Sequence, residues 1–211
     1  MHEPAVTLTD YVLALEGLLF AILLWRQPAG PAGVRRWVVL FLVGFSLTAA
    51  FGGTTHGFFP DHDSTGYAVV WRATLAALGF AAMAGWGLGT ALALPGNWLR
   101  PITIVAGIEY AAYLGVILVI SQEYLFGVLN YVPAALFVLG AFCWLFYRQR
   151  SAAARHGVVA LVLTFTAAGV QTTGLSLHPV YLDHNVLYHL IQGVGIVFLY
   201  LAGRGLDPAA A

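Results

Sequence analysis

Seven apolar segments, each long enough to cross a lipid bilayer, are the feature that most constrains how this chain folds. A membrane-spanning helix needs about 20 predominantly apolar residues. Segments of this kind cover residues 8–25, 36–56, 67–92, 100–120, 126–147, 157–177 and 184–203. The connections between them are short and rich in proline, glycine and charged residues, so they leave no room for a separate soluble domain. The sequence therefore predicts an all-α fold, with one seven-helix membrane domain over residues 1–211.

Composition supports a bilayer as the main partner and excludes several function classes. The chain is 60% hydrophobic and only 9% charged, whereas soluble domains carry about 25% charged residues. Its formal net charge is zero, which argues against nucleic acid as a partner. All nine basic residues are arginine, so a retinal Schiff base, which needs a lysine amine, is excluded. A single cysteine, Cys143, rules out an internal disulfide.

The distribution of arginine predicts the orientation of the chain in the membrane. Arginines gather in the connections after the first, third and fifth segments and after the last one, and these are Arg26, Arg35, Arg36, Arg100, Arg148, Arg150, Arg155 and Arg204. The remaining connections carry acidic residues instead. Because cytoplasmic loops are enriched in basic residues, we expect the N-terminus outside and the C-terminus in the cytoplasm. The expected location is the inner membrane of a bacterium.

The last segment carries polar residues that a membrane helix does not need for crossing a bilayer. It opens with Asp183, His184 and Asn185, and His189 and Gln192 follow inside it. Asn185, His189 and Gln192 are spaced i, i+4, i+7, which places them on one face of a helix. Polar groups within a membrane need partners or a water-filled cavity. We therefore interpret this face as part of a functional site, while Asp183 also suits the N-cap of the last helix.

His56 is the predicted partner of this polar face. It ends the second segment, in a run of glycines and threonines over residues 52–57, and small residues let helices approach closely. In the predicted orientation His56 and His189 both lie near the outer face. The sequence thus predicts an outward-facing polar cavity between the second, third and seventh segments, with Thr55 in its lining. The alternative for His56 is a half-solvated residue that caps its helix.

Three charged residues, Glu16, Arg72 and Glu109, lie inside the predicted segments. A charged side chain at the bilayer centre costs about 2.5–3.5 kcal/mol on the insertion scale, so exposure of these groups to lipid is unfavourable. Three interpretations stay open. Arg72 forms a structural ion pair with a glutamate, the charges bind a ligand or transfer protons, or the carboxyl groups are neutral and hydrogen-bonded.

The topology and the histidines resemble the alkaline ceramidase and adiponectin-receptor superfamily of seven-span membrane hydrolases. In that superfamily, Ser-x-x-x-His in span two, an Asp in span three and His-x-x-x-His in span seven build a zinc site that hydrolyses amide bonds of lipids. His56 and His189 match two of these histidines. The chain departs from this pattern at three positions. Gly52 stands in place of the serine, and span three has Arg72 in place of an aspartate. Asn185 stands at the first histidine position of span seven, with His184 one residue before it.

The resemblance implies a zinc-dependent hydrolase that acts on an amide or ester bond of a lipid. Zinc would lower the pKa of a bound water and so generate the nucleophile. The metal candidates are His56, His189 and His184, with Asp183, Glu16 and Glu109 as other options for the third ligand. The catalytic candidates are Asp183, Glu109 and Arg72, whose guanidinium would stabilise the developing oxyanion. The substrate cavity is expected to include Thr55, Asn185 and Gln192.

Two other function classes fit the same residues. Transport or binding of a small ligand suits the glycine-rich spans, the buried charges and the amides Gln171 and Gln192. A haem with His56 and His189 as axial ligands is the second alternative. The sequence leaves the oligomeric state open.

Overall fold

The computed structural model describes residues 1–27, 32–178 and 181–206. These ranges contain seven helices that are long and apolar enough to cross a membrane. They are α1 (Pro4–Trp25), α2 (Ala32–Phe58), α3 (Thr65–Ala93), α4 (Leu99–Gly115), α5 (Tyr124–Gln149), α6 (Ala152–Thr173) and α7 (His184–Gly205). A 3-10 turn, η1 (Gly96–Trp98), precedes α4, and one turn of π-helix, η2 (Val116–Ile120), continues it. The predicted all-α, seven-helix architecture is confirmed.

Local sequence explains several helix ends. Three helices begin after a side chain that accepts a hydrogen bond from a backbone N–H of the first turn, which is the usual role of an N-cap. These caps are Ser64, Ser151 and Asp183. The N-cap interpretation of Asp183 is therefore confirmed. At the other end of α6, Gly174 adopts a positive φ of 69°, a conformation that terminates helices.

Gly174 also explains why α6 ends before the predicted segment boundary. The sixth span was expected over residues 157–177, whereas α6 covers Ala152–Thr173. The apolar residues Leu175 and Leu177 follow the glycine, so they extend the hydrophobic run without extending the helix. Leu177 instead enters a short turn whose backbone bonds to Leu182.

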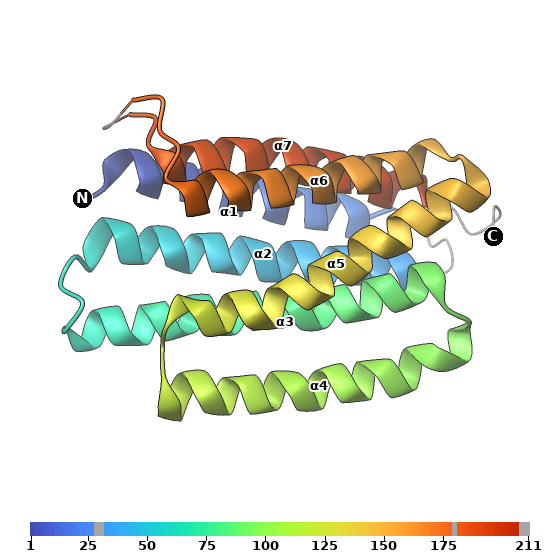
Figure 1. The fold of residues 1–211 in the computed structure, drawn as a ribbon, viewed down its shortest axis with the longest axis horizontal. Coiled ribbons are helices and arrows are strands. Elements are labelled where there is room, and N and C mark those ends of the chain that lie inside the picture. Colours follow the sequence, from blue (N-terminus) through green and yellow to red (C-terminus); the bar gives the residue numbers. More distant parts are fainter. Residues whose placement is uncertain (28–31, 179–180, 207–211) are drawn as a thin grey trace.

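Six helices form a closed ring, and α4 lies outside it. α1 packs against α2 and α7, α3 packs against α2 and α5, and α6 packs against α5 and α7. Figure 1 shows α5 crossing the bundle obliquely from α3 towards α6, and α4 running along the outer side of α3. The main hydrophobic core contains buried residues from all six ring helices. A small second cluster of Leu75, Tyr113 and Ile117 joins α3 to α4 and η2.

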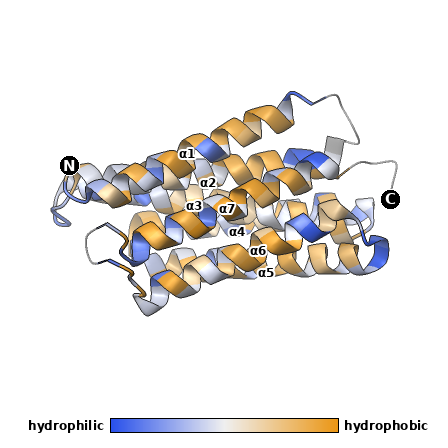
Figure 2. Cartoon of the chain, turned by 90° about the horizontal axis from the view of Figure 1, so that it is seen from above, coloured by the Kyte–Doolittle hydropathy of each residue, from blue (hydrophilic) through white to orange (hydrophobic). Residues whose placement is uncertain are grey.

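The outer surface of the bundle is apolar along the helices. Figure 2 shows hydrophobic colouring over their length and hydrophilic colouring concentrated towards the ends of the bundle. Large apolar side chains such as Leu15 on α1 and Ile108 on α4 are more than 60% exposed. Exposure of this kind suits contact with lipid chains rather than with water. The protein is therefore an integral membrane protein in contact with a bilayer.

Candidate functional site

His189 of α7 lies between two consecutive side chains of α1. Its Nδ1 is 2.7 Å from Thr9 Oγ1, and its Nε2 is 3.1 Å from Asp10 Oδ1. The side chains of His189 and Asp10 are each only 7% exposed. Because both ring nitrogens have partners, the imidazole is fixed in the interface between α1 and α7.

The hydroxyl group of Thr9 has backbone partners besides His189. Thr9 Oγ1 also lies 3.0 Å from Ala5 O and 2.9 Å from Val6 O, so it donates its single hydrogen to the backbone of α1. It therefore accepts a hydrogen bond from His189 Nδ1–H. His189 Nε2 then faces Asp10 Oδ1 across the interface at 3.1 Å, which is an ion-pair distance.

The start of α1 and the glycines of α2 place Asp10 in this interface. α1 begins at Pro4, a residue favoured in the first turn of a helix, so Asp10 lies well inside the helix. A Cβ atom at Gly53 of α2 would lie 2.7 Å from the Cβ atom of Asp10. Only glycine at this position lets α2 approach the backbone of α1 so closely. At Gly52 the nearest atom to an added Cβ is Asp10 Oδ1 at 3.8 Å, which is an ordinary contact.

His56 has a separate partner at the end of α2. Its Nδ1 is 2.7 Å from Glu3 Oε2, and the two side chains are 35% and 42% exposed. His56 and His189 therefore each pair with a different carboxyl group. No group of three His, Cys, Asp or Glu residues that could hold a metal ion occurs among the residues that the structure describes. The described side chains do not fit a three-ligand zinc site, and zinc stays a prediction from the sequence.

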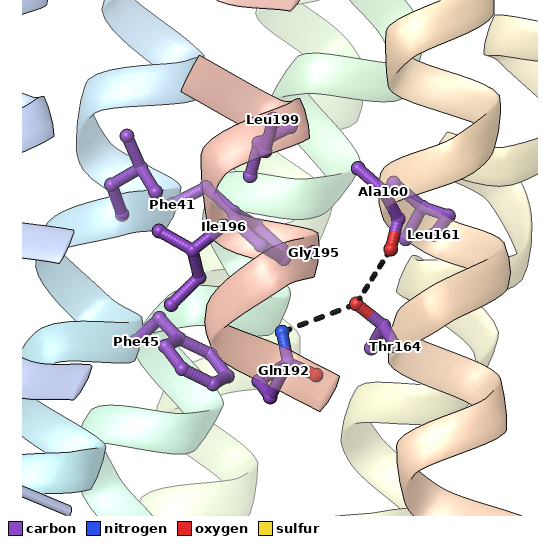
Figure 3. A pocket seen from close by; sticks show the side chains of 10 residues that line it. Phe41, Phe45, Ala160, Leu161, Thr164, Gln192, Gly195, Ile196 and Leu199 are labelled. Carbon is purple, nitrogen blue, oxygen red and sulfur yellow. Dashed lines mark hydrogen bonds between the residues drawn. The ribbon is translucent and has the colours of Figure 1, made fainter. Parts of the chain in front are cut away.

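The polar face of α7 contacts two different helices. Whereas His189 faces α1, Gln171 of α6 donates to Asn185 Oδ1 at 3.2 Å. Gln192 donates to Thr164 Oγ1 of α6, also at 3.2 Å, and Figure 3 shows this pair. Two further candidates are Thr55, predicted to line the cavity, and His184, predicted as a metal ligand. Thr55 is buried and bonds to its own helix, and His184 is half-buried at the start of α7.

A small cavity lies beside Gln192, between α2, α6 and α7 (Figure 3). Its volume is about 10 Å³, close to the minimum that one water molecule needs. Apolar side chains such as Phe41, Phe45 and Ile196 form most of its lining. Gln192 Oε1 is buried and has no hydrogen-bond partner among the described residues. The cavity is too small for a lipid substrate.

The three predicted catalytic residues lie in three different places. Asp183 caps α7 through a 2.8 Å bond from Val186 N–H. Arg72 Nε donates to Ile117 O at 3.2 Å, and Glu109 accepts a hydrogen bond from Asn130 of α5. In the described part of the chain, no ion pair joins Arg72 to a carboxylate. The structure does not bring these residues together, and their catalytic roles stay predictions.

Sequence reasoning missed Asp10, Thr9 and Glu3. The first span was predicted to begin at residue 8, which assigns Asp10 to the outer edge of the membrane rather than to a buried helix interface. One signal was available in the sequence. Glu3 and Asp10 are seven residues apart, so on a helix that begins at Pro4 their side chains lie near the same face.

Comparison with known proteins gives one result that covers the whole bundle. No curated protein and no solved structure matches the chain. A family model, described as a family of unknown function (DUF6962), matches residues 5–208. This range includes nearly the whole of α1 and all of the other six helices. The chain therefore belongs to this family of unknown function, DUF6962.

Proposed function

We propose that this protein is a proton-coupled membrane carrier of a small solute, with Asp10, His189 and Thr9 as its proton-binding site. The buried Asp10–His189 contact is the observation that carries the proposal. Acidic and histidine side chains inside membrane helices are rare, and they commonly serve as proton relays in pumps and transporters. The arginine distribution supports an orientation in which this site lies towards the outer face of a bacterial inner membrane.

The geometry couples proton binding to the packing of α1 against α7. A proton shared between His189 Nε2 and Asp10 Oδ1, which lie 3.1 Å apart, would hold the two helices together across the interface. Without it, a carboxylate and a nitrogen lone pair face each other 3.1 Å apart in a buried site. An uncompensated buried charge of this kind costs several kcal/mol. Release of the proton therefore favours a rearrangement in which α1 and α7 separate or a donor group of the solute takes the place of the proton.

Proton flux in proteoliposomes tests this function. Vesicles that contain a pH-sensitive dye are exposed to a panel of amines, organic acids and sugars. We expect at least one solute class to drive proton flux in the wild-type protein and the flux to be lost in Asp10→Asn and His189→Gln. His156→Gln is the matched control, because His156 lies in α6 beside Phe198 and outside the α1–α7 site, and it should keep the flux. No solute-driven flux, or flux that persists in Asp10→Asn, contradicts the proposal.

The zinc-dependent lipid hydrolase remains the competing proposal from the sequence. It makes the opposite demand on His189, because zinc ligation requires a free ring nitrogen. In the described structure both nitrogens are engaged, with Thr9 and with Asp10. Ligation would therefore break one of these two contacts. Metal content of the purified protein separates the two proposals, as set out in the Discussion.

A further inference from the structure

Glu109 and Asn130 connect the peripheral helix α4 to α5. α4 packs along α3 and buries few of its own side chains, among them Ala106 and Tyr113. The amide Nδ2 of Asn130 donates a hydrogen bond to Glu109 Oε1. This bond joins α4 to α5, whereas the Asp10–His189 contact joins α1 to α7.

One remaining oxygen on each residue of this pair receives no hydrogen bond from the described residues. Glu109 Oε2 and Asn130 Oδ1 are both buried, and neither has a hydrogen-bond partner among the described residues. An ionised carboxylate and an amide oxygen can only accept hydrogen bonds. Flipping the amide would exchange its oxygen and nitrogen without changing this count. When Glu109 is ionised, the pair therefore lacks a hydrogen-bond donor for Glu109 Oε2 and Asn130 Oδ1.

Neighbouring groups on α4 do not supply the missing hydrogen. The hydroxyl of Tyr110 donates to Ala76 O at 3.0 Å, and that of Tyr113 donates to Leu75 O at 3.1 Å. Each tyrosine thus uses its single hydrogen on the backbone of α3. Arg100 lies nine residues before Glu109, in the first turn of α4.

The charged groups on the adjacent helices lie elsewhere. Arg72 is the one charged residue of α3, and its Nε bonds to Ile117 O, eight residues beyond Glu109 or roughly 12 Å along a helix. On α5, the ring of Tyr124 packs near Trp71 and that of Tyr131 near Phe41. The remaining charges of this helix are at its ends, with Glu123 exposed at the N-cap and Arg148 in the last turn.

A proton on Oε2 satisfies both unpaired oxygens at once. The carboxylic O–H would donate to Asn130 Oδ1 while the amide N–H donates to Glu109 Oε1. The same proton removes the charge that makes a carboxylate costly within a membrane. We propose that Glu109 is a second proton-binding site of this protein, held by reciprocal pairing with Asn130.

Carbodiimide labelling tests the protonation directly. Dicyclohexylcarbodiimide takes the proton of a carboxylic acid on one nitrogen while the carboxyl oxygen bonds to its central carbon, and the adduct rearranges to a stable N-acylurea. The labelled peptide therefore gains the mass of one whole reagent molecule. We expect Glu109 to be labelled in the folded protein at neutral pH, and the labelling to fall as the pH rises. Exposed Glu123 should stay unlabelled.

Two further measurements keep this inference distinct from the proposed carrier function. Labelling of Glu109 should be unchanged in Asp10→Asn, because the two sites share no contact. Glu109→Gln should melt at or above the wild-type temperature at neutral pH, because a glutamine amide can pair reciprocally with Asn130 as the protonated acid does. Wild-type stability should decrease as the pH rises, since the folded state holds a proton that the unfolded state releases. The Glu109→Gln variant should lose this decrease, and Glu123→Gln should retain it.

Three results would overturn the inference. They are an unlabelled Glu109 at neutral pH, protection of Glu109 by sodium ions at constant pH, and a clear loss of stability in Glu109→Gln at neutral pH. Protection by sodium would identify a cation site in place of a proton site. A loss of stability in the glutamine variant would show that the pair needs an ionised carboxylate.

Discussion

Two adjacent glycines of α2 allow a sharp test of how Asp10 is positioned. An added Cβ at Gly53 would lie 2.7 Å from Asp10 Cβ and 3.3 Å from Thr7 O, whereas at Gly52 the nearest atom is 3.8 Å away. The same substitution, glycine to alanine, therefore overpacks one position and fits the other. Any difference between the two variants reports on the contact between α1 and α2.

The magnitude follows from the contact distances. At Gly53 the contact with Asp10 must open from 2.7 Å to the ordinary range above 3.4 Å. The obstructing atom is a Cβ, which moves only with its backbone, so α1 itself must shift. Overpacking of this kind costs about 1–3 kcal/mol. The gain in helix propensity from glycine to alanine is roughly 1 kcal/mol at either position and cancels between the variants. We expect Gly53→Ala to melt roughly 2–12 °C below Gly52→Ala.

Thermal unfolding in detergent micelles measures this difference, with the wild-type protein alongside. The solute-driven proton flux of Gly53→Ala should also fall, because a shift of α1 displaces Asp10 and Thr9 from His189. Gly52→Ala should keep the wild-type flux and melt at or slightly above the wild-type temperature. Equal melting temperatures for the two alanine variants would refute the packing of α1 on α2 described here, and with it the placement of Asp10 beside His189.

Three further experiments test the remaining contacts and the zinc prediction. His189→Leu should lower the free energy of unfolding by about 3–5 kcal/mol, because it leaves Asp10 buried without a partner. Adding Asp10→Leu should restore part of this loss. If the effects of the two substitutions are simply additive, the double-mutant cycle argues against the contact. Gly157→Ala would place a Cβ atom 2.2 Å from the ring of a fully buried phenylalanine, whereas the Cβ atom of Gly169→Ala would enter open space. The free energy of unfolding should therefore be about 1–3 kcal/mol lower for Gly157→Ala than for Gly169→Ala. Equal denaturation midpoints for these two would contradict the packing of α5 on α6. Elemental analysis of purified protein should find zinc well below one ion per chain, whereas stoichiometric zinc that is lost in His56→Ala and in His189→Ala would support the hydrolase.

The seven spans and the cap of α7 were predictable because they depend on local properties. Each span follows from the length of an apolar run, and Asp183 follows from the preference of helix N-caps for short polar side chains. The end of α6 was predicted incorrectly because hydrophobicity continues through Leu175 and Leu177, while the backbone conformation of Gly174 had already ended the helix. Hydropathy reports the residues that prefer lipid, whereas helix termination depends on backbone geometry.

The partners of the polar residues were not predictable, because they depend on which helices lie side by side. The spacing of Asn185, His189 and Gln192 correctly predicts a common face of α7. That face lies over the junction between α1 and α6, so His189 reaches α1 while the two amides reach α6. Thr9 and His189 are 180 residues apart, and helical periodicity carries no information about a contact over that distance.

Depth in the membrane explains why Arg72 does not neutralise a glutamate. α3 and α4 run antiparallel (Figure 1), and Arg72 lies at the level of Ile117, roughly 12 Å along the helix from Glu109. At that separation an ion pair cannot form. The other arginines lie near the helix ends where α1 finishes and α2 begins. The partners of Asp10 and Glu109 in the described structure are therefore a histidine and a neutral amide. This absence of a nearby arginine is the common physical reason for the two proton-binding sites proposed above.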